Sequence, residues 1–341
     1  MLPFANDYSR GAHPKVLQAL IDTNMDAQPG YGQDIYTKRA AQKIQAACEA
    51  PDAEVFFISG GTQTNQVVIS NLLDGDEGVV AADSGHINFH EAGSIEYTGH
   101  KVLTLPGERG KITAKNLQSY LDDWQADENH GQMVAPGLVY ISFSTELGTL
   151  YSKQELADLS QVCRQNQIPL FMDGARLGYG LMSPECDLSL ADIAKYCDIF
   201  YIGGTKVGAL AGEAVVFTKH NVPKRFTTKI KRQGAMLAKG RLIGVQFDAL
   251  FTDNLYFKLS QHAIDLAMKL KRALKDKGYQ FLIDSPTNQQ FVVVTNDQLA
   301  ELKKHVDLSF WEVVDDTHTA IRLVTSWSTT EQELDALIAI L

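Results

Sequence analysis

The sequence predicts an α/β protein with a mostly parallel sheet, followed by a smaller α+β unit. Short apolar segments alternate with amphipathic helical segments over most of the chain. The apolar segments are flanked by Gly, Asp or Pro, which is typical of strands buried on both faces of a parallel sheet. After Gly244 this alternation gives way to one long helical pattern. Alternating strands and helices form an open sheet that helices cover on both sides.

The expected sheet has seven strands, taken from the apolar segments of strand length. These segments are Val55–Ser59, Val79–Ala82, Val102–Leu105, Leu138–Phe143, Pro169–Met172, Ile199–Ile202 and Ala214–Phe217. Helical periodicity lies between them, for example over Lys115–Trp124 and Lys153–Gln167. Each strand is therefore expected to lead into a helix that packs back on the sheet.

The C-terminal part begins with an amphipathic stretch of helical period, at about Leu255–Lys277. Two strand candidates, Gln290–Thr295 and Ala320–Val324, and a terminal helix at Glu331–Leu341 follow. This pattern predicts a small α+β domain that the N-terminal arm joins. The expected parts are an arm over residues 1–12, a large α/β domain over 13–243 and a small domain over 244–341.

Composition excludes several classes of protein. The 341 residues are 45% hydrophobic, which is enough for a large core. The formal net charge of −10 and the lack of a basic stripe argue against nucleic-acid binding. No apolar run approaches the roughly 18 residues of a membrane span. The start resembles no signal peptide and the four cysteines form no CxxC pair, so we expect a cytoplasmic protein with reduced thiols.

Two strand ends carry the most informative side chains. Pro169–Met172 ends in Asp173, and Ile199–Ile202 leads through Gly203-Gly204-Thr205 to Lys206. Ligands of open α/β sheets bind beyond the carboxyl ends of the strands, so these side chains are expected to share a crevice. A lysine amine there can form an imine with an aldehyde cofactor, and a carboxylate can hold a pyridine nitrogen protonated.

Each of these residues also has an ordinary interpretation. Asp173 alone fits a turn or helix cap, and Lys206 alone fits a surface lysine in a glycine-rich turn. The pair at two strand ends is what favours a site.

A third strand end resembles an anion-binding turn. Val55–Ser59 is followed by Gly60, Gly61 and Thr62, and then by a helix of apolar period. Glycines at such a turn let backbone N–H groups approach a phosphate at the helix N-terminus. A tight turn uses glycine for ordinary reasons as well.

His86 follows a fourth strand, Val79–Ala82. An imidazole at this place can stack on the ring of an aromatic cofactor. His90 and Glu91 lie nearby, but the HxxxHE spacing fits neither common zinc-protease motif, so no metal site is expected. His90 is interpreted as a histidine of the helix surface or the core.

Taken together, these segments resemble the low-specificity L-threonine aldolases. This family belongs to the pyridoxal 5'-phosphate (PLP) enzymes of fold type I and is grouped with the β-eliminating lyases. The resemblance runs over nearly the whole chain in order and spacing. It includes Asn6-Asp7, YGQD at Tyr31–Asp34, SGGTQTNQ at Ser59–Gln66, ADSGH at Ala82–His86, STELGTLY at Ser144–Tyr151, MDGAR at Met172–Arg176, GGTK at Gly203–Lys206 and IRLVTSW at Ile321–Trp327.

The resemblance implies roles for individual residues. Lys206 is similar to the lysine that holds PLP, Asp173 to the partner of the pyridine nitrogen, and His86 to the ring-stacking residue and a candidate acid–base group. Gly60, Gly61 and Thr62 are similar to the phosphate turn. Arg176 and Arg322 are similar to arginines that clamp carboxylate groups, and a guanidinium suits that task. The resemblance also implies that Asn6 and Tyr31 contact the substrate, Tyr31 across a subunit interface.

Two departures from the family pattern affect what can be assigned. Asn6 stands where relatives have serine, although an asparagine side chain can still donate to a carboxylate. Ser142–Glu146 has no histidine where many aldolases have one. The resemblance therefore does not assign the group that handles the substrate hydroxyl.

The implied reaction is retro-aldol cleavage of L-threonine or L-allo-threonine to glycine and an aldehyde. The alternative is a PLP-dependent β-eliminating lyase or aminotransferase that uses the same lysine and aspartate, because one fold hosts many reactions. A non-catalytic PLP carrier is a third possibility. The resemblance also implies a homodimer or homotetramer with shared active sites.

Overall fold

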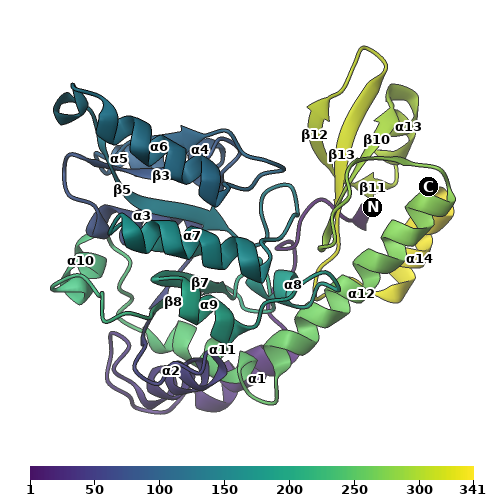
Figure 1. Cartoon of the computed structure of the whole chain (residues 1–341). Coiled ribbons are helices and arrows are strands. Elements are labelled where there is room, and N and C mark those ends of the chain that lie inside the picture. The colour runs from purple at the N-terminus through teal and green to yellow at the C-terminus, as the bar shows by residue number, and fades with distance from the viewer.

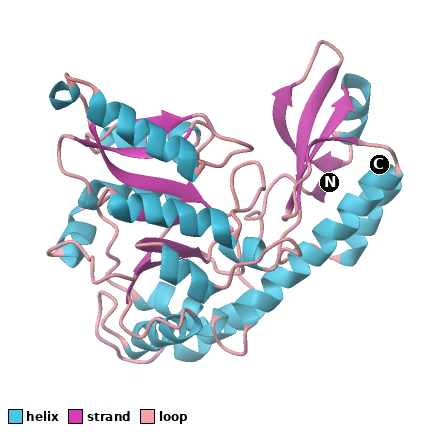
Figure 2. Cartoon of the chain, in the orientation of Figure 1, coloured by secondary structure: helices cyan, strands magenta, loops and turns pink.

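The computed structural model describes residues 1–341 and contains two main bodies of secondary structure (Figure 1). A seven-stranded sheet with helices on both faces forms the larger body, and a four-stranded antiparallel sheet forms the smaller one. Figure 2 shows the two groups of strands apart from each other, with the long helix α12 (Leu255–Asp276) extending from the large body to the small one. The predicted α/β class with a smaller C-terminal sheet unit is confirmed.

The large sheet has one antiparallel strand among parallel ones. Its spatial order is β2 (Glu54–Ile58), β8 (Glu213–Phe217), β7 (Ile199–Gly203), β6 (Leu170–Asp173), β5 (Ala135–Ser142), β3 (Glu77–Ala82) and β4 (Val102–Leu105). β8 runs antiparallel to both of its neighbours, and the other pairs are parallel. The start of β8 consequently lies beside the ends of β2 and β7.

Side chains of these strands alternate between two buried faces, as strand geometry requires. Val79 and Ala81 belong to one hydrophobic cluster, whereas Val80 and Ala82 belong to the other. The first face packs against α3 (Gly61–Leu72), α5 (Ser94–Tyr97) and α10 (Phe226–Arg232). The opposite face packs against α1 (Pro14–Thr23), α2 (Ile35–Ala47), α6 (Ala114–Ala126), α7 (Lys153–Gln165), α8 (Leu177–Leu181), α9 (Leu190–Tyr196) and α11 (Arg241–Leu250).

The small sheet has the order β12 (Ser309–Val313), β13 (His318–Val324), β10 (Gln289–Thr295) and β9 (Gln280–Ile283). A separate cluster of buried apolar residues lies between this sheet, α12 and α14 (Glu331–Ile340). Three shorter elements are α4 (His86–Phe89), a 3₁₀ turn at His130–Gln132 and α13 (Asn296–Leu302).

Helix α12 belongs to both bodies. Leu259 and Ala263 in its first half join the core of the large sheet, whereas Leu270 and Leu274 join the core of the small one. The predicted domain boundary at residue 243 falls inside α11, two residues after its start. The domain boundaries stay predictions.

The N-terminal arm lies against the small sheet body (Figure 1). Its strand β1 (Leu2–Pro3) pairs in parallel with β11 (Val306–Asp307). Phe4 is fully buried in the small core, and its carbonyl accepts a hydrogen bond from the N–H of Val324. The arm thereby fixes the start of the chain to a region made some three hundred residues later.

Candidate active site

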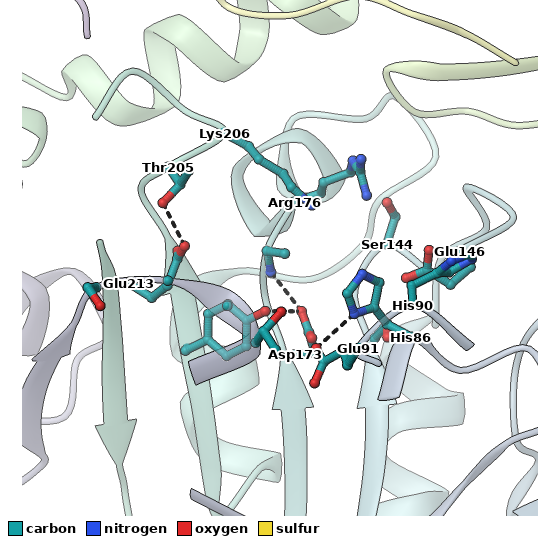
Figure 3. Close-up of a pocket in the computed structure, with 17 residues that line it drawn as sticks. His86, His90, Glu91, Ser144, Glu146, Asp173, Arg176, Thr205, Lys206 and Glu213 are labelled. Carbon is teal, nitrogen blue, oxygen red and sulfur yellow. Dashed lines mark hydrogen bonds and ion pairs between the residues drawn. The ribbon is translucent and has the colours of Figure 1, made fainter. Parts of the chain in front are cut away.

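A cavity of about 310 Å³ opens at the carboxyl ends of the central strands (Figure 3). Its lining is strongly polar, with only two hydrophobic residues among seventeen. Lys206, Asp173 and His86 face it together, as predicted, and so do Arg176 and the turn Gly60–Thr62. A polar cavity at this edge of an α/β sheet is the usual place for a ligand.

Asp173 is the last residue of β6 and points to the α3 face. Strand alternation puts it on the same side as Phe171, under Asn65 of α3. Its carboxylate accepts hydrogen bonds from the hydroxyls of Tyr140 and Tyr201, from Asn65 Nδ2 at 3.0 Å and from the N–H of Ala175 at 2.9 Å. Burial alone would raise the pKa of Asp173, but nearby His86 and these side-chain donors lower it below its ordinary value. Asp173 therefore stays ionised.

Lys206 enters the cavity from the side opposite Asp173 (Figure 3). It follows β7 by way of a glycine-rich turn, and Tyr179 fixes its backbone by donating to the carbonyl of Lys206 at 2.6 Å. Burial, and then the charge of Arg176, lower the pKa of the Lys206 amine from its usual range, although Asp7 and other carboxylates oppose them. A lowered pKa leaves more of the amine in the unprotonated, nucleophilic form.

His86 is the first residue of α4 and is held by a buried glutamate. His86 Nδ1 lies 2.8 Å from Glu91 Oε1, and Glu91 is 4% exposed. Burial lowers the pKa of His86, but the hydrogen bond to Glu91 and the charges of Glu146 and Asp173 raise it above its usual value. With the proton held at Nδ1, the other ring nitrogen is free to accept a proton from the cavity.

Asn65 connects this pair to Asp173. Its Nδ2 group donates to Glu91 Oε1 at 2.8 Å and to Asp173 Oδ2 at 3.0 Å. A single amide thus fixes the distance between two carboxylates that would otherwise repel each other.

The turn Gly60–Thr62 leaves the start of α3 without a side-chain cap. Gly60 is the residue before the first helical turn, and no side chain accepts from the first N–H groups. A Cβ on Gly61 would lie 3.2 Å from the hydroxyl of Tyr201, so a larger residue would disturb a donor of Asp173. Unpaired N–H groups at the positive end of a 12-residue helix suit an anion.

Arg176 lies in the cavity wall, and its guanidinium is already paired. Its Nε and one Nη donate to the two oxygens of Asp7, at 2.7 and 3.1 Å. Both residues are buried, and Asn288 Nδ2 also donates to Asp7 at 3.0 Å. Burial lowers the pKa of Arg176 and Asp7 raises it, so that the pKa rises overall. The other Nη of Arg176 makes no hydrogen bond within the protein and can donate to a ligand.

Arg322 reaches the same region from β13 of the small sheet. It lines a second cavity of about 460 Å³, whose lining shares His86, Arg176 and Lys206 with the first. Its Nη atoms contact only neutral acceptors, among them Gln289 Oε1 at 2.9 Å, and its buried Nε has no partner. Burial, and then the charge of Arg176, lower the pKa of Arg322.

Two predicted residues lie outside both cavities. Asn6 Oδ1 accepts a hydrogen bond from the N–H of Tyr8 at 3.0 Å. Tyr31 is 49% exposed and lies under Lys231, whose Nζ is 4.6 Å from the ring centroid. Within one chain, therefore, neither residue faces Lys206.

The structure adds residues to which the sequence assigns no role. Glu91, Asn65, Tyr140 and Tyr201 hold His86 and Asp173, and Glu213 lies buried at another wall. Only the contact between His86 and Glu91 has a signal in the sequence, because Glu91 follows His86 by five residues. His90, interpreted as a surface or core histidine, is exposed and also lines the cavity, next to Glu146 (Figure 3).

Comparisons with known proteins identify the family of the chain. Residues 5–297 match the beta-eliminating lyase family. The low specificity L-threonine aldolase of Pseudomonas sp. (strain NCIMB 10558) is 27% identical over 339 residues, which cover 98% of this chain and 96% of the relative. The corresponding enzyme of Escherichia coli (strain K12) is 23% identical over 94% of each chain.

Solved structures agree as well. A structure of Leishmania major threonine aldolase is 44% identical, with a TM-score of 0.96, and the match covers 100% of this chain and 98% of that one. A putative L-allo-threonine aldolase from Listeria monocytogenes EGD-E is 19% identical with a TM-score of 0.77, covering 100% of this chain and 95% of that one, and shows the shared fold. The chain therefore belongs to the beta-eliminating lyase family and is a relative of the threonine aldolases.

Proposed function

We propose that the protein is a PLP-dependent aldolase that cleaves L-threonine or L-allo-threonine to glycine and an aldehyde. One observation carries this proposal: Lys206 and Asp173 face a single cavity that also contains the uncapped N-terminus of α3. An amine, a carboxylate and an anion-binding turn match the aldehyde, the pyridine nitrogen and the phosphate of PLP.

The donor set of the cavity fits that cofactor. Asp173 is ionised and can accept from a pyridinium N–H, and Lys206 has an amine of lowered pKa. Ser144 Oγ is buried in the cavity wall without a hydrogen-bond partner, as expected where a ligand completes the polar contacts. When bound, PLP supplies an electron sink that stabilises negative charge on the substrate α-carbon.

Substrate orientation falls to the two arginines. Arg322 has an unpaired Nε and only neutral partners, so it is the principal group for the substrate carboxylate. Arg176 can add the Nη that does not donate to Asp7. The position in which the arginines hold the carboxylate determines which bond of the α-carbon is aligned for cleavage.

His86 is our candidate for moving the hydroxyl proton. Glu91 holds the proton at Nδ1, so the other ring nitrogen can accept the proton of the substrate β-hydroxyl directly or through water. His86 could therefore handle the substrate hydroxyl although the segment Ser142–Glu146 contains no histidine.

We further propose that two or four chains associate and that Tyr31 serves the site of a neighbouring chain. Its exposed ring lies outside the cavity of its own chain, as expected for a residue donated to another. Sedimentation of an active protein as a monomer would contradict this arrangement.

No helix of the chain combines the length and the apolar character that crossing a membrane requires. The cytoplasmic location stays a prediction.

The experiment incubates the purified protein with PLP and each threonine diastereomer and measures the products. Glycine with acetaldehyde supports the aldolase. Pyruvate with ammonia would indicate a β-eliminating lyase, and a keto acid with pyridoxamine phosphate an aminotransferase. In the Lys206→Ala variant we expect turnover to fall by about 10³-fold or more, because the covalent anchor is lost. Lys277→Ala, at an exposed site on the end of α12, is the matched control.

A further inference from the structure

Glu213 is a buried acid in the cavity wall to which the proposed reaction gives no role. It is the first residue of β8 and pairs with Ile58 and Gly203, the last residues of β2 and β7. Because β8 is antiparallel, its first residue lies beside the turn Ser59–Thr62 that follows β2. Glu213 is 4% exposed and lines the same cavity as that turn.

No cation pairs with this carboxyl group. Lys and Arg residues form many ion pairs elsewhere in the chain, but none of these involves Glu213. Its contacts are with neutral groups of the loop that carries Lys206. The N–H of Gly204 donates to Oε2 at 2.9 Å, and Thr205 Oγ1 lies 2.8 Å from Oε1 (Figure 3).

The hydroxyl of Thr205 has only one proton, and the protonation state of Glu213 determines where that proton points. Thr205 Oγ1 already accepts a hydrogen bond from the N–H of Gly212 at 3.0 Å. If Glu213 is ionised, the Thr205 proton must point to Oε1. If Glu213 is neutral, its own O–H can donate to Thr205 Oγ1, and the Thr205 proton can turn into the cavity. Thr205 lines the cavity, so this choice changes what a ligand meets.

We propose that Glu213 is a positioning residue that must be a neutral carboxylic acid for the phosphate end of the cofactor to bind, and that it makes Thr205 a donor. The inference rests on the proposed function, since it takes PLP as the ligand. An ionised, unpaired carboxylate beside the turn would repel the phosphate and would leave Thr205 unable to donate to it.

The surroundings of Glu213 favour the neutral form. Burial raises the pKa of Glu213 to about 8, and the hydrogen bonds from Thr205 and Gly204 only partly oppose it. Among charged and titratable neighbours, Lys206 lowers the pKa and Asp173 raises it. Tyr201 and Tyr256 lie near enough for the charge of Glu213 to act on them, and each keeps its proton because burial raises its pKa. A bound phosphate would raise the pKa of Glu213 further.

The test separates the phosphate from the aldehyde. Dissociation constants are measured between about pH 7 and pH 9 for pyridoxine 5'-phosphate, which has no aldehyde, and for pyridoxal, which has no phosphate. The wild type is compared with Glu213→Gln, whose amide is always neutral and can donate to Thr205. Dividing the two constants at each pH cancels the titration of the probe and of every other shared group.

For pyridoxine 5'-phosphate, we expect the wild-type dissociation constant to rise about 10-fold relative to that of Glu213→Gln by pH 9, since about one unit above its pKa little neutral acid remains. For pyridoxal the ratio should stay constant. In Thr205→Val the phosphate probe should bind more weakly at pH 7, and Thr205→Ser should restore binding. These two variants test the same contact if Glu213→Gln does not fold.

Opposite results would have distinct meanings. A wild type that binds PLP but shows a constant ratio for pyridoxine 5'-phosphate overturns the role of Glu213 and leaves the cofactor in place. Equal pH dependence for pyridoxal overturns it too, since the effect would then not concern phosphate. A wild type that binds PLP at no pH overturns the proposed function together with this inference.

Discussion

Three charged groups on the large-sheet side of the active site are more fully paired than Arg322 on the small-sheet side. On the large-sheet side, Asp173 has four donors, His86 has Glu91 and Arg176 has Asp7. On the small-sheet side, Arg322 has a buried Nε without a partner and makes hydrogen bonds to neutral acceptors only. Tyr8 and Phe310, which line the same cavity, are each more than half exposed.

This difference separates two tasks. Paired and buried groups cannot rearrange easily, so the large-sheet side is organised before any ligand arrives. An arginine without a carboxylate partner retains its capacity to bind one, so the small-sheet side is suited to a substrate that must enter and leave. Substitutions on the large-sheet side should therefore change stability or turnover, whereas substitution of Arg322 on the small-sheet side should change substrate binding.

The largest effect should come from breaking the pair of Arg176 and Asp7. We expect Arg176→Met to lower the free energy of unfolding by about 3–5 kcal/mol, because the carboxylate of Asp7 is left buried without a charge partner. Denaturant unfolding measures the change. The double variant Arg176→Met, Asp7→Leu should recover part of the loss. A single variant as stable as the wild type would show that the pairing is not structural.

Asp173→Asn should affect turnover rather than folding. The substitution removes the charge that we propose to lie opposite the pyridine nitrogen, and we expect kcat to fall by about 10²–10³-fold, in the range found when one electrostatic contact to the transition state is lost. Steady-state kinetics at saturating PLP measure it. Asp297→Asn, at an exposed position of α13, serves as the control. An unchanged kcat would show that the charge of Asp173 does not contribute to turnover.

Arg322→Ala should act mainly on substrate binding. Loss of a charge-assisted contact with the carboxylate should raise KM by about 10- to 100-fold. The free energy of unfolding should change far less than in Arg176→Met, because Arg322 leaves no buried carboxylate unpaired. A loss of stability as large as that of the Arg176 variant would abolish the contrast between the two sides.

The smallest effect concerns the pH dependence that His86 imposes. As a base, His86 must be unprotonated, so kcat/KM should rise with pH through a pKa that lies above the ordinary imidazole value. In Glu91→Gln the negative partner is lost, the pKa of His86 falls, and the rising limb should move to lower pH by about one unit or less. Glu96→Gln, at an exposed site, should leave the limb in place. A limb that does not move in Glu91→Gln would exclude His86 as its source.

The sequence reveals the parts of the site that depend on local pattern. Asp173 and Lys206 follow buried strands directly, and the carboxyl ends of parallel strands meet at one edge, so their common cavity could be predicted. The turn Gly60–Thr62 could be predicted in the same way, from its place between a strand and a helix.

The partners of these residues depend on information that a single sequence does not display. Asp7 and Arg176 are 169 residues apart, and no local pattern links them. The donors Tyr140 and Tyr201 appear in the sequence as ordinary members of apolar strands, and only the sheet order places them on either side of Asp173. Likewise, Glu213 becomes informative only once β8 is known to run antiparallel beside the turn.

The small sheet was predicted only in part for a related reason. Strands β10 and β13 are apolar and largely buried, and both were expected. Strand β12 lies at the sheet edge with Phe310 and Val313 exposed, so its pattern shows no clear alternation of buried and exposed positions. Edge strands lack the second neighbour that would impose such a pattern.

The docking of the N-terminal arm has a consequence for the order in which this protein can fold. Phe4 and Asp7 are made some three hundred residues before Val324 and Asn288, which are among their partners. During synthesis, the apolar side chain of Phe4 and the carboxylate of Asp7 stay unburied until Asn288 and Val324 have been made. Contacts of such long sequence separation form slowly. We therefore expect the Asp7–Arg176 pair to form late in folding, once Asn288 and Val324 are in place beside the arm.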